Sequence, residues 1–251
     1  AGGGVLMAPN VAGLGRMDVG RALGDRLGVK VVIENDVNLA VFGEHWQGHG
    51  QGVDNLAFIA LGTGIGAGLI LGGELVRGAS GAAGEIAYLP FGADPFEPES
   101  RHAGALEREV ATHGMKRRYA ALVGFERSVP EIFDLAAGGD QAAVQVLDET
   151  ARTLCRAVLA LQAVIDPEIV VLGGSIGGRE ELVSRVRALL PLCLAAPVRI
   201  ENSRLGQRAA LVGAAAIGLS RLHNGLFGAE APIGSIPLPA RQDEKLSEAA
   251  E

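Results

Sequence analysis

The sequence is poor in cysteine and in aromatic residues. It contains two cysteines among 251 residues, and aromatic residues make up 4%. Two cysteines cannot provide a disulfide framework for a chain of this length. We expect Cys155 and Cys193 to be reduced thiols in the core, with one disulfide between them as the alternative. Alanine, leucine and valine are left to fill the core.

The sequence also lacks an excess of positive charge and long apolar runs. Its formal net charge is −7, and an acidic surface repels the phosphates of nucleic acids. No uncharged apolar run reaches the roughly eighteen residues of a membrane span. The segment Ala1–Gly4 has no basic residue, which argues against a secretory signal. We therefore predict a cytoplasmic protein without membrane contacts and, because the first residue is not Met, a chain that begins inside a longer gene product.

Glycine is abundant, with 37 residues, and hydrophobic residues make up 48% of the chain. The glycines predict tight turns and close backbone approaches, and the hydrophobic content suffices for one large core or two lobes. Apolar spacing and turn residues predict, in order, helix 18–28, strand 29–33, helix 36–47, strands 56–61 and 66–71, surface loop 92–103, helices 106–124, 129–137 and 140–165, strand 169–172, helix 180–192, strand 198–201 and helix 209–222. This order indicates an α/β fold. Residues 229–251 are expected to form a disordered tail.

The stretch Glu34-Asn35-Asp36 lies between a predicted strand and a predicted helix. An amide beside a carboxylate can bind sugar hydroxyls, and a carboxylate that touches a primary hydroxyl can act as general base in phosphoryl transfer. The alternative is that Asp36 only caps the helix by accepting a hydrogen bond from its first amides.

Two glycine-rich stretches, 62–68 and 172–177, lie at the ends of predicted strands. In the first, glycines allow backbone amides to approach an anion and a threonine adds a donor, but no Gly-Lys-Ser/Thr of a P-loop follows. A plain hairpin turn would have the same sequence. The second precedes a predicted helix, where nucleotides bind in doubly wound folds, although a simple strand-to-helix turn fits equally. Taken alone, Glu85 is compatible with a solvent-facing charge, and Glu107 with an acid in the first turn of a helix.

No single motif identifies a family, but their order along the chain is specific. The series is Ala8-Pro9-Asn10, Glu34-Asn35-Asp36-Val37-Asn38, Gly62-Thr63-Gly64-Ile65-Gly66, Gly84-Glu85-Ile86, Gly104-Ala105-Leu106-Glu107 and Gly173-Gly174-Ser175. This series resembles the ROK family of repressors and sugar kinases over residues 8–177, with a compatible continuation to Leu222. The resemblance implies an α/β, actin/hexokinase-like (ribonuclease H-like) two-lobed fold, usually a homodimer, with a small-molecule sugar between the lobes. Residues 1–228 would form this region, with the amino-terminal part of the first lobe missing.

The resemblance also implies roles for individual residues. Sugar contacts would be Asn10, Asn35, Asp36, Glu85 and Glu107. In a kinase, Asp36 would be the catalytic base. A nucleotide, if one binds, would contact Gly62, Thr63, Gly64, Gly66, Gly173 and Gly174.

The sequence departs from the family at the position of its zinc site. Many ROK proteins have a His three residues after the Glu85 position, followed by three cysteines that bind zinc with it. Here the His position is Tyr88, and residues 92–106 contain no cysteine. His102 alone cannot replace a site of about four ligands, so no metal is expected. Tyr88 keeps a hydroxyl that can contact the sugar.

A second departure lies upstream. Neither the Asp-x-Gly-Gly-Thr phosphate loop of ROK kinases nor the helix-turn-helix of the family's repressors occurs before Asn10. Retained sugar residues with missing zinc and phosphate elements predict the effector-sensing part of a transcriptional regulator, most similar to the zinc-motif-lacking NagC/XylR-type proteins. It would not be an enzyme, would need no cofactor, and would bind DNA only through a helix-turn-helix absent from this chain. The alternative is a sugar kinase that uses ATP and Mg²⁺.

Overall fold

The structure, a computed structural model, describes residues 18–227. The strands of this part form one sheet in the order β3-β2-β1-β4-β5. An antiparallel meander consists of β1 (Leu56–Leu61), β2 (Ile65–Leu71) and β3 (Glu74–Leu75). β4 (Ile169–Gly173) pairs parallel with β1, and β5 (Arg199–Asn202) pairs parallel with β4. The sheet is therefore mixed, with an antiparallel meander beside two parallel strands.

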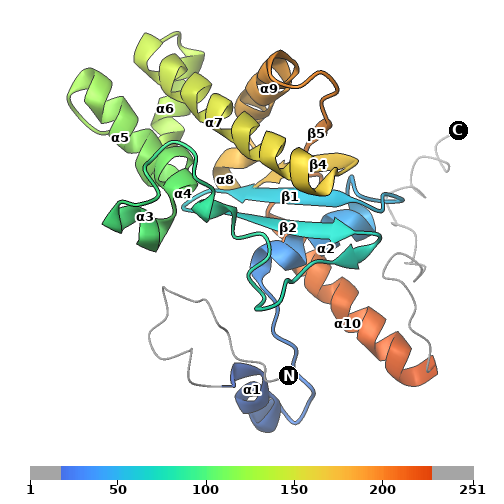
Figure 1. Cartoon of the computed structure of the whole chain (residues 1–251). Helices are drawn as coiled ribbons and strands as arrows, with labels where there is room; N and C mark the ends of the chain where they lie inside the picture. Colours follow the sequence, from blue (N-terminus) through green and yellow to red (C-terminus); the bar gives the residue numbers. More distant parts are fainter. Residues whose placement is uncertain (1–17, 228–251) are drawn as a thin grey trace, which may run out of the picture.

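Helices cover both faces of this sheet (Figure 1). One face packs against α2 (Asp36–Gln47) and α10 (Ala209–Phe227). The other face packs against a larger group: α4 (Ala105–Val110), α5 (Thr112–Val123), α6 (Val129–Ala137), α7 (Gln141–Ile165) and α9 (Glu180–Leu189). Shorter elements are α1 (Val19–Leu27), α3 (Pro98–Ala103), α8 (Gly174–Gly177) and the 3₁₀ turns η2 (Ile86–Tyr88), η3 (Leu190–Leu192) and η4 (Gly206–Arg208).

The strands supply side chains to both cores by simple alternation. In β1, Ile59 and Leu61 belong to the larger core, whereas Leu56 and Phe58 belong to the smaller one. Successive side chains of a strand point to opposite faces, so a run that is apolar throughout is typical of a strand buried on both sides. No helix within residues 18–227 is both long enough and apolar enough to cross a bilayer.

Several predicted elements are confirmed, among them helices 36–47 and 129–137 and strand 56–61. The predicted strand 29–33 is wrong: it pairs with no other described segment, and Val29, Val32 and Ile33 are exposed. β-branched residues favour a strand only where a neighbouring strand and a packed face are available. Both cysteines are free, as expected, but only Cys155 is buried, and Cys193 is exposed.

Two further predictions need correction between residues 92 and 124. The predicted surface loop 92–103 ends in α3, where Pro98 occupies the first helical turn, a position that tolerates proline. The single predicted helix 106–124 is two helices, α4 and α5, separated at Ala111. The tail 229–251 lies outside the described residues.

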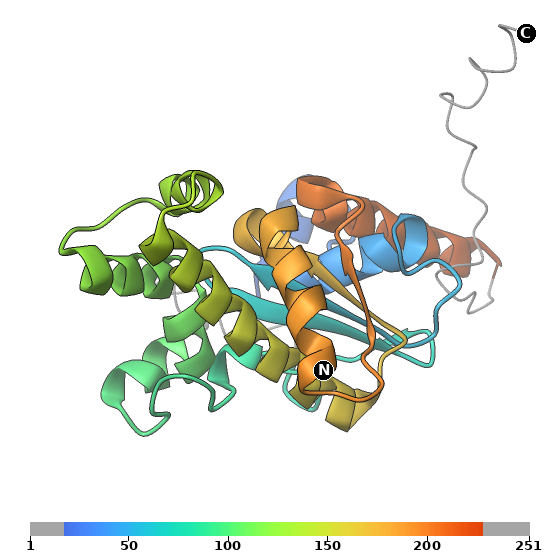
Figure 2. The ribbon, with the colours of Figure 1, turned by 90° about the horizontal axis from the view of Figure 1, so that it is seen from above.

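Two glycines allow α2 and α10 to approach closely, and Figure 2 shows these helices side by side. A Cβ at Gly43 of α2 would collide with the carbonyl of Ala209, and a Cβ at Gly213 of α10 would collide with the carbonyl of Leu39. Because α2 begins at Asp36, this contact fixes the helix whose first residues are candidate sugar contacts.

We predict that Gly213→Ala destabilises the protein by about 1–3 kcal/mol, because the added methyl group meets backbone that cannot move alone. The matched control is Gly218→Ala on the same helix, where nothing lies within 4 Å of the added Cβ. The control should raise the free energy of unfolding by up to ~1 kcal/mol, since alanine favours helix more than glycine does. Urea unfolding measures both, and equal effects would contradict the prediction.

Candidate functional site

The beginning of α2 presents Asn35 and Asp36 at the surface. Asn35 caps the helix: its Oδ1 accepts hydrogen bonds from the amides of Val37 at 2.8 Å and Asn38 at 3.3 Å. Asp36 is the first helical residue and is exposed, and its Oδ1 also accepts from the Val37 amide, at 2.9 Å. The capping role that the sequence allowed for Asp36 therefore belongs mainly to Asn35, and the Asp36 carboxylate is available to a ligand.

An ion pair that the sequence analysis missed joins the start of α2 to residues 77–85. Arg77 donates from Nε to Oε2 of Glu34 at 2.8 Å, and its Nη2 lies 2.8 Å from the same oxygen. The other oxygen of Glu34 accepts from Nδ2 of Asn38 at 2.9 Å. The Glu34 side chain is only 11% exposed, so water screens this pair less than a surface pair. No local pattern of the sequence indicates this ion pair, because its partners are 43 positions apart.

A small hollow lies where the start of α2, strand β2 and the 77–85 segment meet. Its lining consists of Asn35, Val37, Asn38, Gly66, Ala67, Gly81, Ala83, Gly84 and Glu85. The Gly84 carbonyl accepts a hydrogen bond from the Ala67 amide at 2.8 Å, which fixes the segment to β2. Gly84 has a φ of 91° and no room for a Cβ against the Ala67 carbonyl, so glycine is required there. Two predicted sugar contacts, Asn35 and Glu85, thus line one hollow.

Glu107 connects this region to the glycine-rich turn between β1 and β2. Its Oε2 accepts a hydrogen bond from the Ile65 amide at 3.0 Å. Burial raises the pKa of the Glu107 carboxyl; the Ile65 hydrogen bond opposes that rise, and the negative charge of Glu85 adds to it. Glu85 directly precedes η2, which packs against α4, so the two predicted sugar carboxylates lie in one region. A shared region of this kind favours ligands with several hydroxyl donors.

The two glycine-rich stretches meet at the carboxyl ends of β1 and β4. A Cβ at Gly62 would lie 2.9 Å from Oγ of Ser175, and a Cβ at Gly174 would collide with the carbonyl of Leu61. Gly174 also has a φ of 84°, which other residues rarely adopt. In the first turn, the Gly62 amide donates to the Gly64 carbonyl at 2.9 Å. Parallel neighbours place their following loops at one edge of the sheet, where α/β proteins bind ligands.

The two other predicted sugar contacts are Tyr88 and Asn10. Tyr88 is 42% exposed, its hydroxyl lies 3.5 Å from the His102 carbonyl, and it is not among the residues that line the hollow. Asn10 lies outside the described residues. Within residues 18–227, no group of three or more His, Cys, Asp or Glu side chains is arranged to hold a metal.

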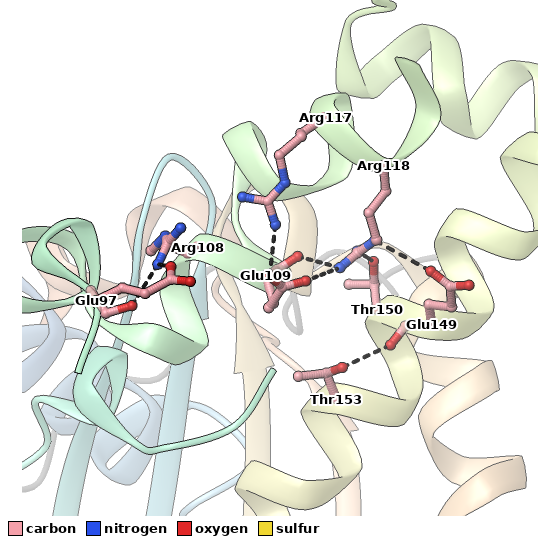
Figure 3. A network of polar contacts seen from close by, with 9 residues as sticks. Glu97, Arg108, Glu109, Arg117, Arg118, Glu149, Thr150 and Thr153 are labelled. Atoms are coloured by element: carbon pink, nitrogen blue, oxygen red, sulfur yellow. Dashed lines mark hydrogen bonds and ion pairs between the residues drawn. The ribbon is translucent and has the colours of Figure 1, made fainter. Parts of the chain in front are cut away.

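Two arginines hold the short helix α4, on which Glu107 lies (Figure 3). Arg108 donates to Glu97 at 2.5 Å and to the Ser100 hydroxyl at 2.6 Å, which joins α4 to α3. Arg118 of α5 donates to the Glu109 carbonyl at 2.6 Å and to the Thr150 hydroxyl of α7 at 2.5 Å. Burial lowers the pKa of Arg118, although its carboxylate neighbours oppose this. These polar contacts join α4 to α3, α5 and α7.

The chain belongs to the ROK family, whose model matches residues 2–221. It is 32% identical over 195 residues to the glucokinase of Thermotoga maritima, covering 71% of this chain and 61% of that protein. It thus spans less than two thirds of this relative. Among solved structures, the ROK family glucokinase from Streptomyces griseus in complex with glucose and AMPPNP matches with a TM-score of 0.71 and 29% identity, over 86% of this chain and 76% of that one.

These similarities confirm the predicted fold class, since the structural neighbours have the actin/hexokinase-like fold of ROK proteins. A ROK family transcriptional regulator, a homologue of the E. coli MLC protein, also matches, with a TM-score of 0.66 and 25% identity over 79% of this chain and 54% of that one. The regulator and the kinases therefore share the fold, and fold alone does not separate the two functions.

The predicted function as a sugar-sensing regulator is wrong, because several of the similar curated proteins and matched structures are named as sugar kinases. The prediction depended on two missing features, the zinc residues around Tyr88 and the phosphate loop upstream of Asn10. The absence of a metal site does not imply a loss of chemistry, since Arg108 and Arg118 hold α4 by other means. The sugar residues in the hollow are equally compatible with a kinase.

The raised pKa of Glu107 predicts the sign of a pH effect. A raised pKa in the folded state adds stability below the pKa of the unfolded chain, and this stability is lost as the pH rises through the folded value. Glu107→Gln should therefore raise the melting temperature at pH 7, because the neutral amide avoids both burial of charge and repulsion from Glu85. The difference in melting temperature between Glu107→Gln and the wild type should disappear at about pH 4, near the ordinary pKa of a glutamate carboxyl, because Glu107 is then protonated and neutral as well.

Glu131→Gln provides a control of opposite sign. Hydrogen bonds from the Ser128 side chain and amide lower the pKa of Glu131, so its charge adds stability above the unfolded pKa that is lost as the pH falls. This variant should melt at a lower temperature than the wild type at pH 7. Thermal unfolding between pH 4 and pH 8 measures both, and a shift of Glu107→Gln in the same direction as the control contradicts the prediction.

Proposed function

We propose that this chain is the sugar-binding and nucleotide-binding part of an ATP-dependent sugar kinase of the ROK family. The observation that supports this most directly is the connection of the hollow to the glycine turns: Glu107, a neighbour of Glu85, is bonded to the amide of Ile65. The ROK family glucokinase from Streptomyces griseus binds glucose and AMPPNP. A site with hydroxyl-binding carboxylates beside an anion-binding turn suits the same pair of ligands here.

In this proposal the sugar lies over the hollow, which is too small to enclose a hexose, and its hydroxyls bind Asn35 and Glu85 of the lining and the nearby Glu107. Asp36 takes the proton of the attacking hydroxyl, whose oxygen forms a bond to the γ-phosphorus of ATP while ADP leaves. Residues 62–66 and 173–174 receive the phosphates and the adenosine of ATP, with Mg²⁺ bound to the phosphates. The exposed position of Asp36 at the start of α2 suits a base that has to meet a ligand.

A coupled assay of ADP release with a panel of hexoses, run on the complete gene product, tests the proposal. We expect ATP turnover with at least one sugar, and Asp36→Asn should lower kcat by about 10²–10⁴-fold, the usual contribution of a general base. Asp25→Asn is the control, because that side chain is 75% exposed on α1 and should leave kcat unchanged. A folded wild type without turnover on any sugar, or full activity of Asp36→Asn, would rule the kinase out.

The ion pair of Arg77 with Glu34 gives a second prediction for the same assay. Arg77→Met should raise KM for the sugar about tenfold, which corresponds to ~1.4 kcal/mol, because the segment that ends in Glu85 loses its bond to the start of α2. KM for ATP should change little. Arg127→Met is the control, since the Arg127–Glu131 pair is largely exposed. Equal sugar KM values in the two variants would contradict the proposed role of Arg77.

Two further expectations remain proposals. The first is a homodimer, which light scattering of the purified protein measures. The second is sugar contact by the Tyr88 hydroxyl, whose nearest bonded group is the His102 carbonyl.

A further inference from the structure

The turn between β1 and β2 is bonded at both ends to residues that come much later in the chain. At its start, the Gly62 carbonyl accepts two hydrogen bonds from Thr112, one from the amide and one from the hydroxyl, each 3.1 Å long. At its end, the Ile65 amide donates to Glu107 at 3.0 Å. Both partners belong to the α4–α5 segment, on the face of the sheet that packs the larger core.

These bonds matter because the turn has little else to fix its shape. Two of its three residues, Gly62 and Gly64, are glycines, which restrict the backbone least. Within the turn, the Gly62 amide donates a hydrogen bond to the Gly64 carbonyl. Thr63 between them is exposed. The pairing of Leu61 with Ile65 closes the turn, and contacts from outside restrict its glycines further.

The break between α4 and α5 provides one of these contacts. In a continuous helix the amide of Thr112 would donate to the carbonyl four residues before it, that of Arg108. Instead it donates to Gly62, and α5 begins at Thr112 with Ala111 in an extended conformation, ψ 177°. The sequence predicts one helix over this region, so the break is not a local preference. It places both donors of Thr112 on a single carbonyl of the turn.

We infer that Thr112 is a positioning residue for ATP: by holding Gly62, it keeps the glycine turn in the conformation that receives the phosphates. The inference depends on the proposed kinase function. Thr112 itself is not placed against the nucleotide; it acts through the carbonyl of Gly62. The bond between Glu107 and Ile65 holds the other end of the same turn.

Thr112→Val tests the inference, because valine has nearly the same shape as threonine and lacks only the hydroxyl donor. We expect KM for ATP to rise about 3- to 10-fold, the range that corresponds to one lost hydrogen bond. KM for the sugar, measured at saturating ATP, should stay within about twofold. Thr112→Ser, which keeps the donor, should restore KM for ATP.

The matched control is Thr153→Val on α7. This threonine is 7% exposed, and its hydroxyl also donates to a backbone carbonyl, that of Glu149, at 3.0 Å. The same chemical deletion there should change the melting temperature without changing KM for ATP. If Thr112→Val does not fold, Thr112→Ala provides the same comparison.

Binding of AMPPNP, measured by calorimetry on the same complete gene product, separates this inference from the proposed function. Kinase turnover by the wild type, with equal KM for ATP in Thr112→Val and Thr153→Val, overturns the role of Thr112 and leaves the kinase intact. A wild type without turnover refutes the kinase; the role of Thr112 then stands only if AMPPNP binds and binds 3- to 10-fold more weakly to Thr112→Val. Absence of AMPPNP binding by the wild type overturns both.

Discussion

The parallel pairing of β1 with β4 is the constraint on which the candidate site depends. The two strands are 113 residues apart at their first paired residues, Leu56 and Ile169, and are fully buried there. Because they run in the same direction, the turn after Leu61 and the turn after Gly173 emerge at one edge of the sheet. An antiparallel pairing would place the two glycine turns at opposite edges. The proposed nucleotide site is thus a consequence of strand direction, and the helices on both faces bury the pair that determines it.

The two halves of the site are held by different kinds of contact. The glycine turns follow buried strands, so hydrophobic packing of the sheet determines where they lie. The hollow depends on two polar contacts, the ion pair of the half-exposed Arg77 with Glu34 and the hydrogen bond of Ala67 to Gly84. Such contacts are individually weaker and more easily altered. This division suits a kinase, because its phosphate donor is constant while the pattern of sugar hydroxyls has to be matched by adjustable residues.

The sequence predicted elements well where local pattern and packing agree. Helix 36–47 has both a cap at Asn35 and apolar residues for the smaller core, and it was predicted to the residue. The strand predicted at 29–33 failed because strand formation needs a partner that local sequence does not specify. The break at Ala111 was missed for a related reason: it depends on Gly62, a residue 50 positions away from Thr112. The ordered motifs indicated Asn35 and Glu85, which line one hollow, whereas Arg77, which forms a long-range ion pair, has no local signal.

The same reasoning explains why a missing metal motif misled the functional prediction. A structural zinc holds a loop by linking distant ligands, and its chemistry takes no part in phosphoryl transfer. Arg108 with Glu97, and Arg118 with Thr150, provide comparable links on either side of the residue that contacts Ile65. The requirement is that α4 be held, and several kinds of interaction meet it. In the proposed kinase, the chemistry belongs to the carboxylates and the glycine turns, so a missing zinc motif is no argument against it.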